Sequence, residues 1–257
     1  MSGLHLAISR PLHCFSTALR FLTIFPGLGP VQVDTRSFSG ASYYFTIVGI
    51  VTGCLIGGAA LLCSNFAPPL IIGVAVAVSM SLISGFLHLD GLADTIDGFM
   101  SHRDQEQILA IMKDSRIGVM GAVAIISQLF FKTAAILSLP INGFVSIVVL
   151  ASAAGRTATI LMMTMLPYAR AEGGLGNLFF DRGAARSVSV ISTVLLLAAM
   201  IVLAPGKMLV LAMAFVLTMV SFCGLCVKKI GGYTGDTLGA VCELMETAII
   251  TGAVFSF

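Results

Sequence analysis

The chain has 257 residues, of which 58% are hydrophobic and 10% charged, and its formal net charge is +2 at pH 7. Its mean hydropathy is +1.04, whereas a soluble domain carries about 25% charged residues, so this composition excludes an ordinary soluble fold. The small net charge, with no basic run beyond Lys228-Lys229, also indicates that nucleic acid is not a partner.

The composition predicts an all-α fold, a polytopic transmembrane helical bundle, organised as a single integral-membrane domain over residues 1–257. Residues 1–36 are expected to form a cytoplasmic, interfacial N-terminal segment. Within it, Arg10 and Arg20 interrupt the apolar stretch 4–25. This pattern favours an interfacial helix that lies on the leaflet, and a short first span is the alternative.

Seven spans of about 20 apolar residues are predicted after this segment. No Asp, Glu, Lys or Arg occurs between Arg36 and Asp90, and the stretch is divided at Asn65 and Pro68-Pro69. Polar segments at 90–117, 167–186 and 228–236 separate later spans. The predicted spans lie at about 43–62, 69–89, 118–138, 144–166, 187–204, 208–227 and 237–257.

The flanking charges predict the orientation of the spans. Eleven of the 14 basic residues fall on the side that holds the N-terminus and the three polar segments, and the opposite turns hold Lys207 alone. By the positive-inside rule, the side rich in basic residues is cytoplasmic. The acidic residues are concentrated on the same side, so we expect the chemistry at this face of the membrane.

The first chemical motif is a row of three carboxylates in the sequence HLDGLADTIDG, residues 88–98. Asp90, Asp94 and Asp97 are spaced i, i+4 and i+7, which places them on one face of a helix, where like charges repel. A divalent cation relieves that repulsion, and Mg²⁺ commonly takes one or two carboxylates together with waters and substrate phosphates. The alternative is a solvated acidic helix end.

The second motif, KDSRIGVMG at 113–121, precedes the third predicted span. Asp114 is a candidate metal ligand, and the planar guanidinium of Arg116 suits phosphate oxygens. Gly118 and Gly121 permit the close approach of a ligand or of a neighbouring helix. An ordinary charged connector with small-residue helix packing is the alternative.

The third motif, GGYTGDTLGA at 231–240, leads into the last span. Its residues Gly232, Thr234 and Gly235 form a glycine-rich turn at a helix N-terminus, which exposes N–H groups suited to phosphate. Asp236 and Glu243 are seven residues apart and share a helix face.

Carboxylates and cations inside apolar spans usually face a polar cavity or a partner. Arg156 is therefore a candidate for neutralising the carboxylates or for binding a phosphate. The alternative pairs Glu243 or Glu246 with Lys132 or Arg156 inside the bundle.

These motifs, together with Gly-Arg at 155–156 and Leu-Arg-Phe-Leu-Thr at 19–23, resemble the signature blocks of the cobalamin synthase family. That family is also called adenosylcobinamide-GDP ribazoletransferase. The resemblance extends from about Arg20 to Glu246 and implies a membrane enzyme that joins adenosylcobinamide-GDP to α-ribazole or its 5′-phosphate. The 3′-hydroxyl of the ribazole would attack the corrinoid-side phosphate and expel GMP.

The resemblance also implies roles for particular residues. Asp90, Asp94 and Asp97, with Asp114, would hold Mg²⁺; Arg116 and Arg156 would bind phosphate, with the glycine-rich segments; Asp94, Asp236 and Glu243 would serve catalysis. Asp94 and Asp236 both remain candidates for the general base. The enzyme would lie in the bacterial inner membrane among lipid, with its active face cytoplasmic, and other corrinoid-assembly enzymes are conceivable partners.

Two other functions remain open. A CDP-alcohol phosphotransferase also begins with Asp-Gly-x-x-Ala on a membrane helix, but here Asp94 follows Ala93, where that family has Arg, and its later Gly-x3-Asp-x3-Asp is missing. A polytopic transporter would use Glu243, Glu246 and Arg156 within the membrane. Transporters typically show repeats and polar sites at the midplane, whereas this chain concentrates its acidic groups at one edge.

Overall fold

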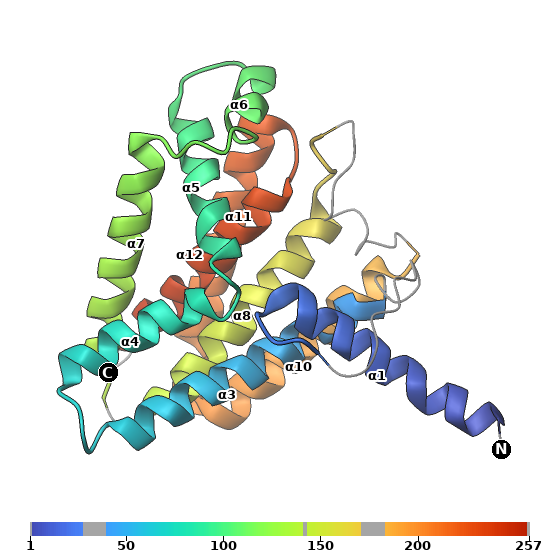
Figure 1. Ribbon diagram of the computed structural model, residues 1–257, viewed down its shortest axis with the longest axis vertical. Helices are drawn as coiled ribbons and strands as arrows, with labels where there is room; N and C mark the ends of the chain where they lie inside the picture. Colours follow the sequence, from blue (N-terminus) through green and yellow to red (C-terminus); the bar gives the residue numbers. More distant parts are fainter. Residues whose placement is uncertain (1, 28–39, 141–142, 171–182, 256–257) are drawn as a thin grey trace.

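The computed structural model describes residues 2–27, 40–140, 143–170 and 183–255 (Figure 1). These residues form helices and no strand, which confirms the all-α fold. The helices are α1 (Ser2–Leu22), α3 (Phe45–Cys63), α4 (Pro69–Leu82), α5 (Leu87–Met100), α6 (Gln105–Ile111), α7 (Val119–Leu137), α8 (Phe144–Met165), α10 (Ala185–Leu203), α11 (Met208–Ile230) and α12 (Gly235–Val254). Short 3-10 turns, η1 (Ser42–Tyr44) and η2 (Pro205–Lys207), precede α3 and α11.

Six of the described helices are long and apolar enough to cross a membrane, and they correspond to six of the predicted spans. They are α3 with η1, α7, α8, α10, α11 with η2, and α12. Counting the bent pair of α4 and α5 as one broken span gives up to seven. Helix α1 confirms the helix that was expected over the apolar stretch 4–25, and its place on the leaflet stays a prediction.

The second predicted span, 69–89, is wrong in its extent. Helix α4 ends at Leu82, and the chain bends by 83° before α5 begins. The bend passes through Gly85 and Phe86, whose φ angles of 62° and 63° are left-handed. Glycine adopts this conformation without a steric penalty, whereas phenylalanine rarely does. Hydropathy alone does not reveal such a break, because apolar residues continue on both sides of it.

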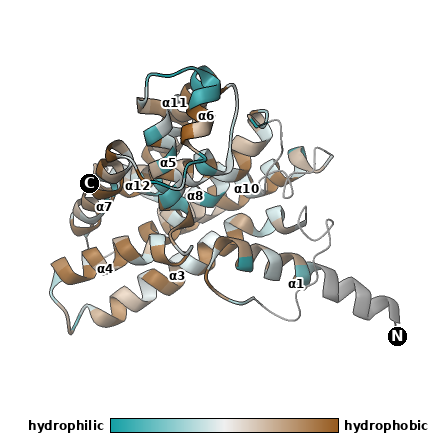
Figure 2. Cartoon of the chain, turned by 45° about the horizontal axis from the view of Figure 1, so that its top comes forward, coloured by the Kyte–Doolittle hydropathy of each residue, from teal (hydrophilic) through white to brown (hydrophobic). Residues whose placement is uncertain are grey.

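The segment that was expected to be a polar connector, 90–117, is helical over much of its length. In α5 the apolar residues Leu89, Leu92 and Phe99 are buried, which gives the helix one face for packing. Asp104 begins α6 by accepting a hydrogen bond from the N–H of Gln107 (2.9 Å). Figure 2 shows that hydrophilic residues gather on α6 and the connection leading to it, whereas hydrophobic residues predominate on α3 and α4.

Helix α8 lies at the centre of the bundle. It packs against α3, α10 and α12, and most of its length is buried. Helix α12 is buried to a similar degree because it contacts α5, α7, α8 and α11. In Figure 1, α5, α7, α11 and α12 run along the long axis, and α6 lies at their upper end. This packing places the N-terminus of α12 beside α5.

Candidate functional site

Helices α5 and α12 cross in close contact, and this crossing positions the site. A Cβ on Gly91 would lie 2.6 Å from the Asp236 carbonyl oxygen, and one on Gly239 would lie 3.0 Å from the His88 Cα. Because Gly91 and Gly239 have no side chain, the backbones of α5 and α12 can come into contact. Because Gly91 meets the first turn of α12 and His88 meets the next, the two helices are antiparallel. The part of α5 after Gly91 thus extends past the end of the spanning helix α12.

Asp90 and Asp94 are the carboxylates that are open to a ligand. Asp90 is exposed and Asp94 is half-buried, and neither carboxylate forms a hydrogen bond with another residue that the structure describes. Partial burial raises the pKa of Asp94 to about 7, and repulsion from Asp90, Asp236 and Asp97 adds to this shift. The three aspartates of the first motif share one helix, as their spacing predicts, and Asp236 joins them from α12.

The Asp97 carboxylate binds the first turn of α7. Its Oδ2 accepts from the N–H of Gly118 (2.7 Å) and its Oδ1 accepts from the N–H of Gly121 (2.8 Å). Unpaired N–H groups at a helix N-terminus are stabilised by such an acceptor. A Cβ at either glycine would overlap the Asp97 carboxylate. The glycines of the second motif therefore contact Asp97, and any contact with substrate stays a prediction.

At the start of α12, Thr234 caps the helix and Asp236 forms an ion pair. The Thr234 hydroxyl accepts from the N–H of Thr237 (3.3 Å), and the Thr237 hydroxyl binds the N–H of Thr234 (2.8 Å). Asp236 Oδ2 accepts from Arg170 Nη2 (2.7 Å) and from the Thr234 hydroxyl (3.3 Å). Gly235 is the first residue of α12, and a Cβ added to it would meet no atom within 4 Å.

A short backbone pairing holds the segment after α8 against the glycine-rich turn. The Tyr233 N–H donates to the Pro167 carbonyl (2.9 Å), and the Ala169 N–H donates to the Tyr233 carbonyl (2.8 Å). A Cβ on Gly232 would overlap the Pro167 carbonyl oxygen, so this close approach requires glycine. The pairing fixes the backbone that leads to Arg170. Arg170 lies outside the three sequence motifs, and no local pattern marks it as a site residue.

A buried ionic cluster connects α7, α8 and α12 inside the bundle. Lys132 Nζ lies 2.6 Å from Glu243 Oε2 and 2.8 Å from Glu246 Oε2, and Arg156 pairs with Glu246 Oε1. All four side chains are at most 1% exposed. Ser81 of α4 donates to Glu243 Oε1 (2.8 Å). Charged groups at such depth are stabilised by pairing with one another.

This cluster matches the alternative pairing that the sequence left open for the two glutamates. The roles expected for Glu243 in catalysis and for Arg156 in phosphate binding stay predictions, since both side chains are at most 1% exposed and ion-paired with residues of the bundle.

Asp114 and Arg116 form an exposed ion pair in the connection before α7. Arg116 Nη2 lies 2.6 Å from Asp114 Oδ2, and the side chains are 87% and 39% exposed for Arg116 and Asp114. Hydrogen bonds from Arg116 lower the pKa of Asp114 to about 2. Within the described parts of the chain, Arg116 supplies all the hydrogen bonds of the Asp114 carboxylate. The structure thus does not bring Asp114 into contact with the aspartates of α5.

The carboxylates of this site fit Mg²⁺ only if ligands from outside the chain complete its coordination. Across residues 2–27, 40–140, 143–170 and 183–255, no three His, Cys, Asp or Glu side chains converge closely enough to hold a metal ion. Mg²⁺ is commonly bound by one or two carboxylates, with waters and phosphate oxygens as its other ligands. Asp90 and Asp94, whose carboxylates have no hydrogen-bond partner among the described residues, are suited to that arrangement.

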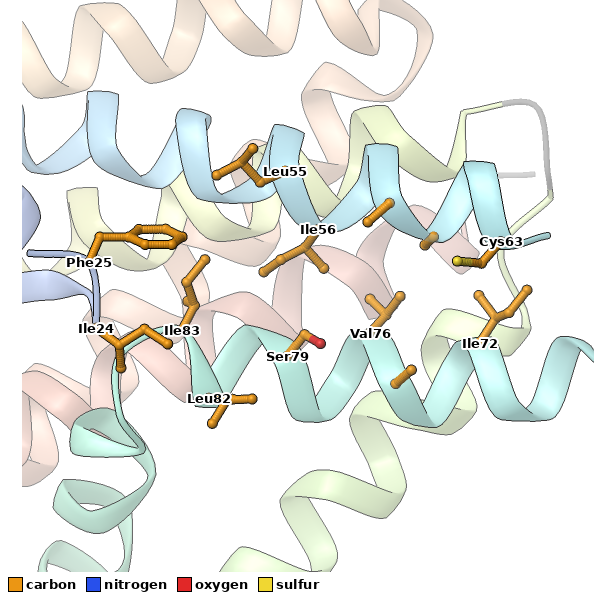
Figure 3. Close-up of a pocket in the computed structure, with 13 residues that line it drawn as sticks. Ile24, Phe25, Leu55, Ile56, Cys63, Ile72, Val76, Ser79, Leu82 and Ile83 are labelled. Carbon is orange, nitrogen blue, oxygen red and sulfur yellow. The ribbon is translucent and has the colours of Figure 1, made fainter. Parts of the chain in front are cut away.

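An apolar pocket of about 360 Å³ lies between α3 and α4. Figure 3 shows Ile56 and Val76 on its walls, with Ile24 and Phe25 at one end. Almost all of its lining residues are apolar, and no charged side chain is among them. A polar, charged substrate therefore does not suit this pocket, and the acidic groups beside α5 remain the candidate site.

Comparison with known proteins gives one consistent family. A model of the family described as cobalamin-5-phosphate synthase matches residues 14–254. The adenosylcobinamide-GDP ribazoletransferase of Desulforamulus reducens is 36% identical over 235 residues, which cover 91% of this chain and 92% of that protein. The protein of the same name from Chlorobium phaeovibrioides is 36% identical over 244 residues, with 94% and 96% covered. No solved structure matches the chain.

Proposed function

Because the chain belongs to the cobalamin-5-phosphate synthase family, we propose that the aspartates of α5 and α12 form the centre at which it carries out its reaction. The chain is an adenosylcobinamide-GDP ribazoletransferase. It joins adenosylcobinamide-GDP to α-ribazole or α-ribazole 5′-phosphate, which yields adenosylcobalamin or its 5′-phosphate together with GMP. This activity replaces the two alternatives, a CDP-alcohol phosphotransferase and a transporter.

The single observation that carries the site assignment is the crossing of α5 and α12, which brings Asp236 beside the helix that carries Asp90 and Asp94. Asp90, Asp94 and Asp97 share α5, and the backbone of Asp236 meets that helix at Gly91. Burial, and then the negative charges of Asp90, Asp236 and Asp97, raise the pKa of Asp94. Like charges gathered in a half-buried position are unfavourable unless a positive group joins them. A centre for phosphoryl transfer has such a requirement, because it must bind a metal ion and an anionic diphosphate together.

Asp90 and Asp94 would hold Mg²⁺, and diphosphate oxygens and waters would complete its coordination. When bound, this ion would neutralise charge on the phosphate oxygens and on the departing GMP. Neither carboxylate forms a hydrogen bond within the described residues, so both are free for this role. Asp114 remains a weaker candidate, because it is paired with Arg116.

The reaction is a displacement at the phosphorus that is bonded to the corrinoid side. The 3′-hydroxyl oxygen of α-ribazole forms the new bond to phosphorus, and the bond to the GMP oxygen breaks. Asp236 would accept the hydroxyl proton. Arg170 and Thr234 hold its Oδ2 in place, and its Oδ1 has no hydrogen-bond partner in the described structure. Asp94 is the other candidate base, because its pKa lies near neutrality when the cation is absent.

Several residues of the motifs would position the site without touching substrate. Asp97 joins α5 to the first turn of α7 through Gly118 and Gly121. Glu243 and Arg156 belong to the ionic cluster below the site, which fixes α12 relative to α7 and α8. Gly235 is exposed at the first turn of α12 and would be open to a phosphate group of either substrate, whereas Thr234 is buried and caps the helix.

The active face would be cytoplasmic, in the inner membrane of a bacterium. The distribution of basic residues supports this orientation, because the segments that carry the aspartates and Arg170 are on the side rich in Lys and Arg. The whole chain would act as one catalytic domain in lipid, and other corrinoid-assembly enzymes would have access to its cytoplasmic face.

The decisive experiment measures GMP release by the purified protein in lipid from adenosylcobinamide-GDP and α-ribazole. We expect turnover that requires Mg²⁺, stops after chelation and returns when Mg²⁺ is added. Corrinoid products are identified in the same samples. Full turnover after chelation would refute the role of the metal, and GMP release from an Asp90→Asn, Asp94→Asn double variant at the wild-type rate would refute the site.

A further inference from the structure

We infer that Arg170 is a diphosphate-binding residue of this site, whose guanidinium bridges Asp236 and the anionic group of the nucleotide-linked substrate. This inference rests on the proposed function of the aspartate site. Arg170 lies outside the motifs at 88–98, 113–121 and 231–240, and it enters the site from the segment after α8.

The backbone directs Arg170 to the site. Pro167 and Ala169 are hydrogen-bonded to Tyr233 on both sides of Tyr168, and the Tyr168 and Tyr233 rings pack edge to face with centroids 5.2 Å apart. Arg170 follows directly after this pairing, so its side chain begins at a fixed point. A side chain on a fixed backbone loses less conformational freedom when it binds a ligand than one on an unsupported segment.

The Arg170 guanidinium forms fewer hydrogen bonds with the described residues than its N–H groups allow. Its Nη2 donates to Asp236 Oδ2 at 2.7 Å, and its Nε is buried without a hydrogen-bond partner in the part of the chain that the structure describes. A buried N–H without an acceptor is unfavourable, which points to an acceptor that is supplied from outside. The side chain is 24% exposed, so a ligand can reach it.

The charge around Arg170 suits this role. Asp94 interacts electrostatically with the negative charges of Asp90, Asp236 and Asp97 and with the positive charge of Arg170. An anionic diphosphate that approached four carboxylates would be repelled, and a guanidinium at the edge of the group provides local attraction. Its planar fork can donate to two phosphate oxygens while another edge stays on Asp236, which a lysine cannot do with the same geometry.

The test compares wild type with Arg170→Gln and Arg170→Lys in lipid nanodiscs. Two ligands are titrated with Mg²⁺ present: adenosylcobinamide-GDP and inorganic pyrophosphate. We expect Arg170→Gln to weaken the binding of both by roughly tenfold to hundredfold, in line with the loss of charged hydrogen bonds. Arg170→Lys should recover part of the affinity, and KM for unphosphorylated α-ribazole should change little. Lys228→Gln, which removes an exposed cation of the same face, should bind both ligands normally.

A double-mutant cycle with Asp236→Asn separates ligand binding from a structural role. If Arg170 contacts the diphosphate, Arg170→Gln weakens pyrophosphate binding in the wild-type and in the Asp236→Asn backgrounds. If Arg170 only neutralises Asp236, the effect disappears once Asp236 is neutral, and the inference is overturned. Unchanged pyrophosphate affinity in folded Arg170→Gln also overturns it.

The pyrophosphate titrations decide the role of Arg170 independently of turnover. If the wild type released no GMP, the proposed function would fail, and these titrations would still show whether Arg170 binds a diphosphate.

Discussion

Lys132 of α7 and Glu243 of α12 form an ion pair with Nζ and Oε2 2.6 Å apart, and both side chains are buried inside the bundle. The same ammonium group lies 2.8 Å from Glu246. Lys132 therefore contacts both glutamates of α12, and Arg156 supplies the second positive charge through Glu246. Lys132 joins α12 to α7, whose first turn binds the acidic α5 through Asp97.

Replacing Lys132 with Met should strongly destabilise the protein, because Glu243 loses its cation and Glu246 keeps only Arg156. Removing one partner of a buried ion pair typically costs about 3–5 kcal/mol. Thermal unfolding in a mild detergent, followed by circular dichroism, measures the effect. The matched control is Lys228→Met at an exposed position. Adding Glu243→Gln to Lys132→Met should restore part of the stability, and equal melting temperatures for Lys132→Met and the control would contradict the prediction.

Replacing Gly121 with Ala should separate α7 from α5. The new Cβ would overlap the Asp97 carboxylate and lie 2.9 Å from the Ala93 carbonyl oxygen. Crowding of this kind costs about 1–3 kcal/mol, and we expect GMP release to fall because the aspartates of α5 move. Gly224→Ala in α11 is the control, since nothing lies within 4 Å of its added Cβ. Normal activity in Gly121→Ala would show that the Asp97 contact does not position the site.

Replacing Asp94 with Asn should lower turnover by about 100-fold or more, the scale seen when a positioned electrostatic group is lost. The fold should survive, because Asp94 is half-buried and its carboxylate makes no hydrogen bond to a described residue. Initial rates of GMP release at saturating Mg²⁺ measure the change, and gel filtration in detergent checks that the variant remains intact. A rate like that of the wild type would remove Asp94 from the site.

Mg²⁺ binding should weaken at low pH because of Asp94. Its pKa is raised to about 7 by partial burial and by neighbouring carboxylates. Below that pH the carboxyl holds a proton that the cation must displace, so the apparent Kd for Mg²⁺ should rise as the pH falls from about 8 to about 6. Calorimetric titration with Mg²⁺ in the presence of pyrophosphate measures this. Asp94→Asn should show a much flatter pH dependence, and identical slopes in the two proteins would contradict the assignment.

Replacing Gly232 with Ala should lower kcat/KM by roughly tenfold or more, because small displacements of positioned groups have large effects on catalysis. The added Cβ overlaps the Pro167 carbonyl oxygen, which would break its hydrogen bond with Tyr233 and shift Arg170. Steady-state GMP release tests this, with Gly206→Ala as the control because its added Cβ meets nothing within 4 Å. Equal kcat/KM in the two variants would show that the pairing does not position Arg170.

The sequence was sufficient for six of the membrane-spanning helices and for the type of chemistry. Hydropathy is a sum over neighbouring residues, and each long apolar run must satisfy its own backbone hydrogen bonds in a membrane. The runs at 144–166 and 237–257 therefore identified α8 and α12 closely. The spacing of Asp90, Asp94 and Asp97 likewise placed three carboxylates on one helix, because that relationship is local.

Only the tertiary structure decided where these helices cross and which charges meet. The bend at Gly85 and Phe86 turned an expected span and its connector into separate helices. The pairing of Asp97 with the first turn of α7, of Arg170 with Asp236 and of Lys132 with Glu243 joins residues 21 to 111 positions apart. Such contacts depend on the crossing of whole helices, which is set by packing along their full length. A pattern in a short stretch of sequence contains no information about that crossing.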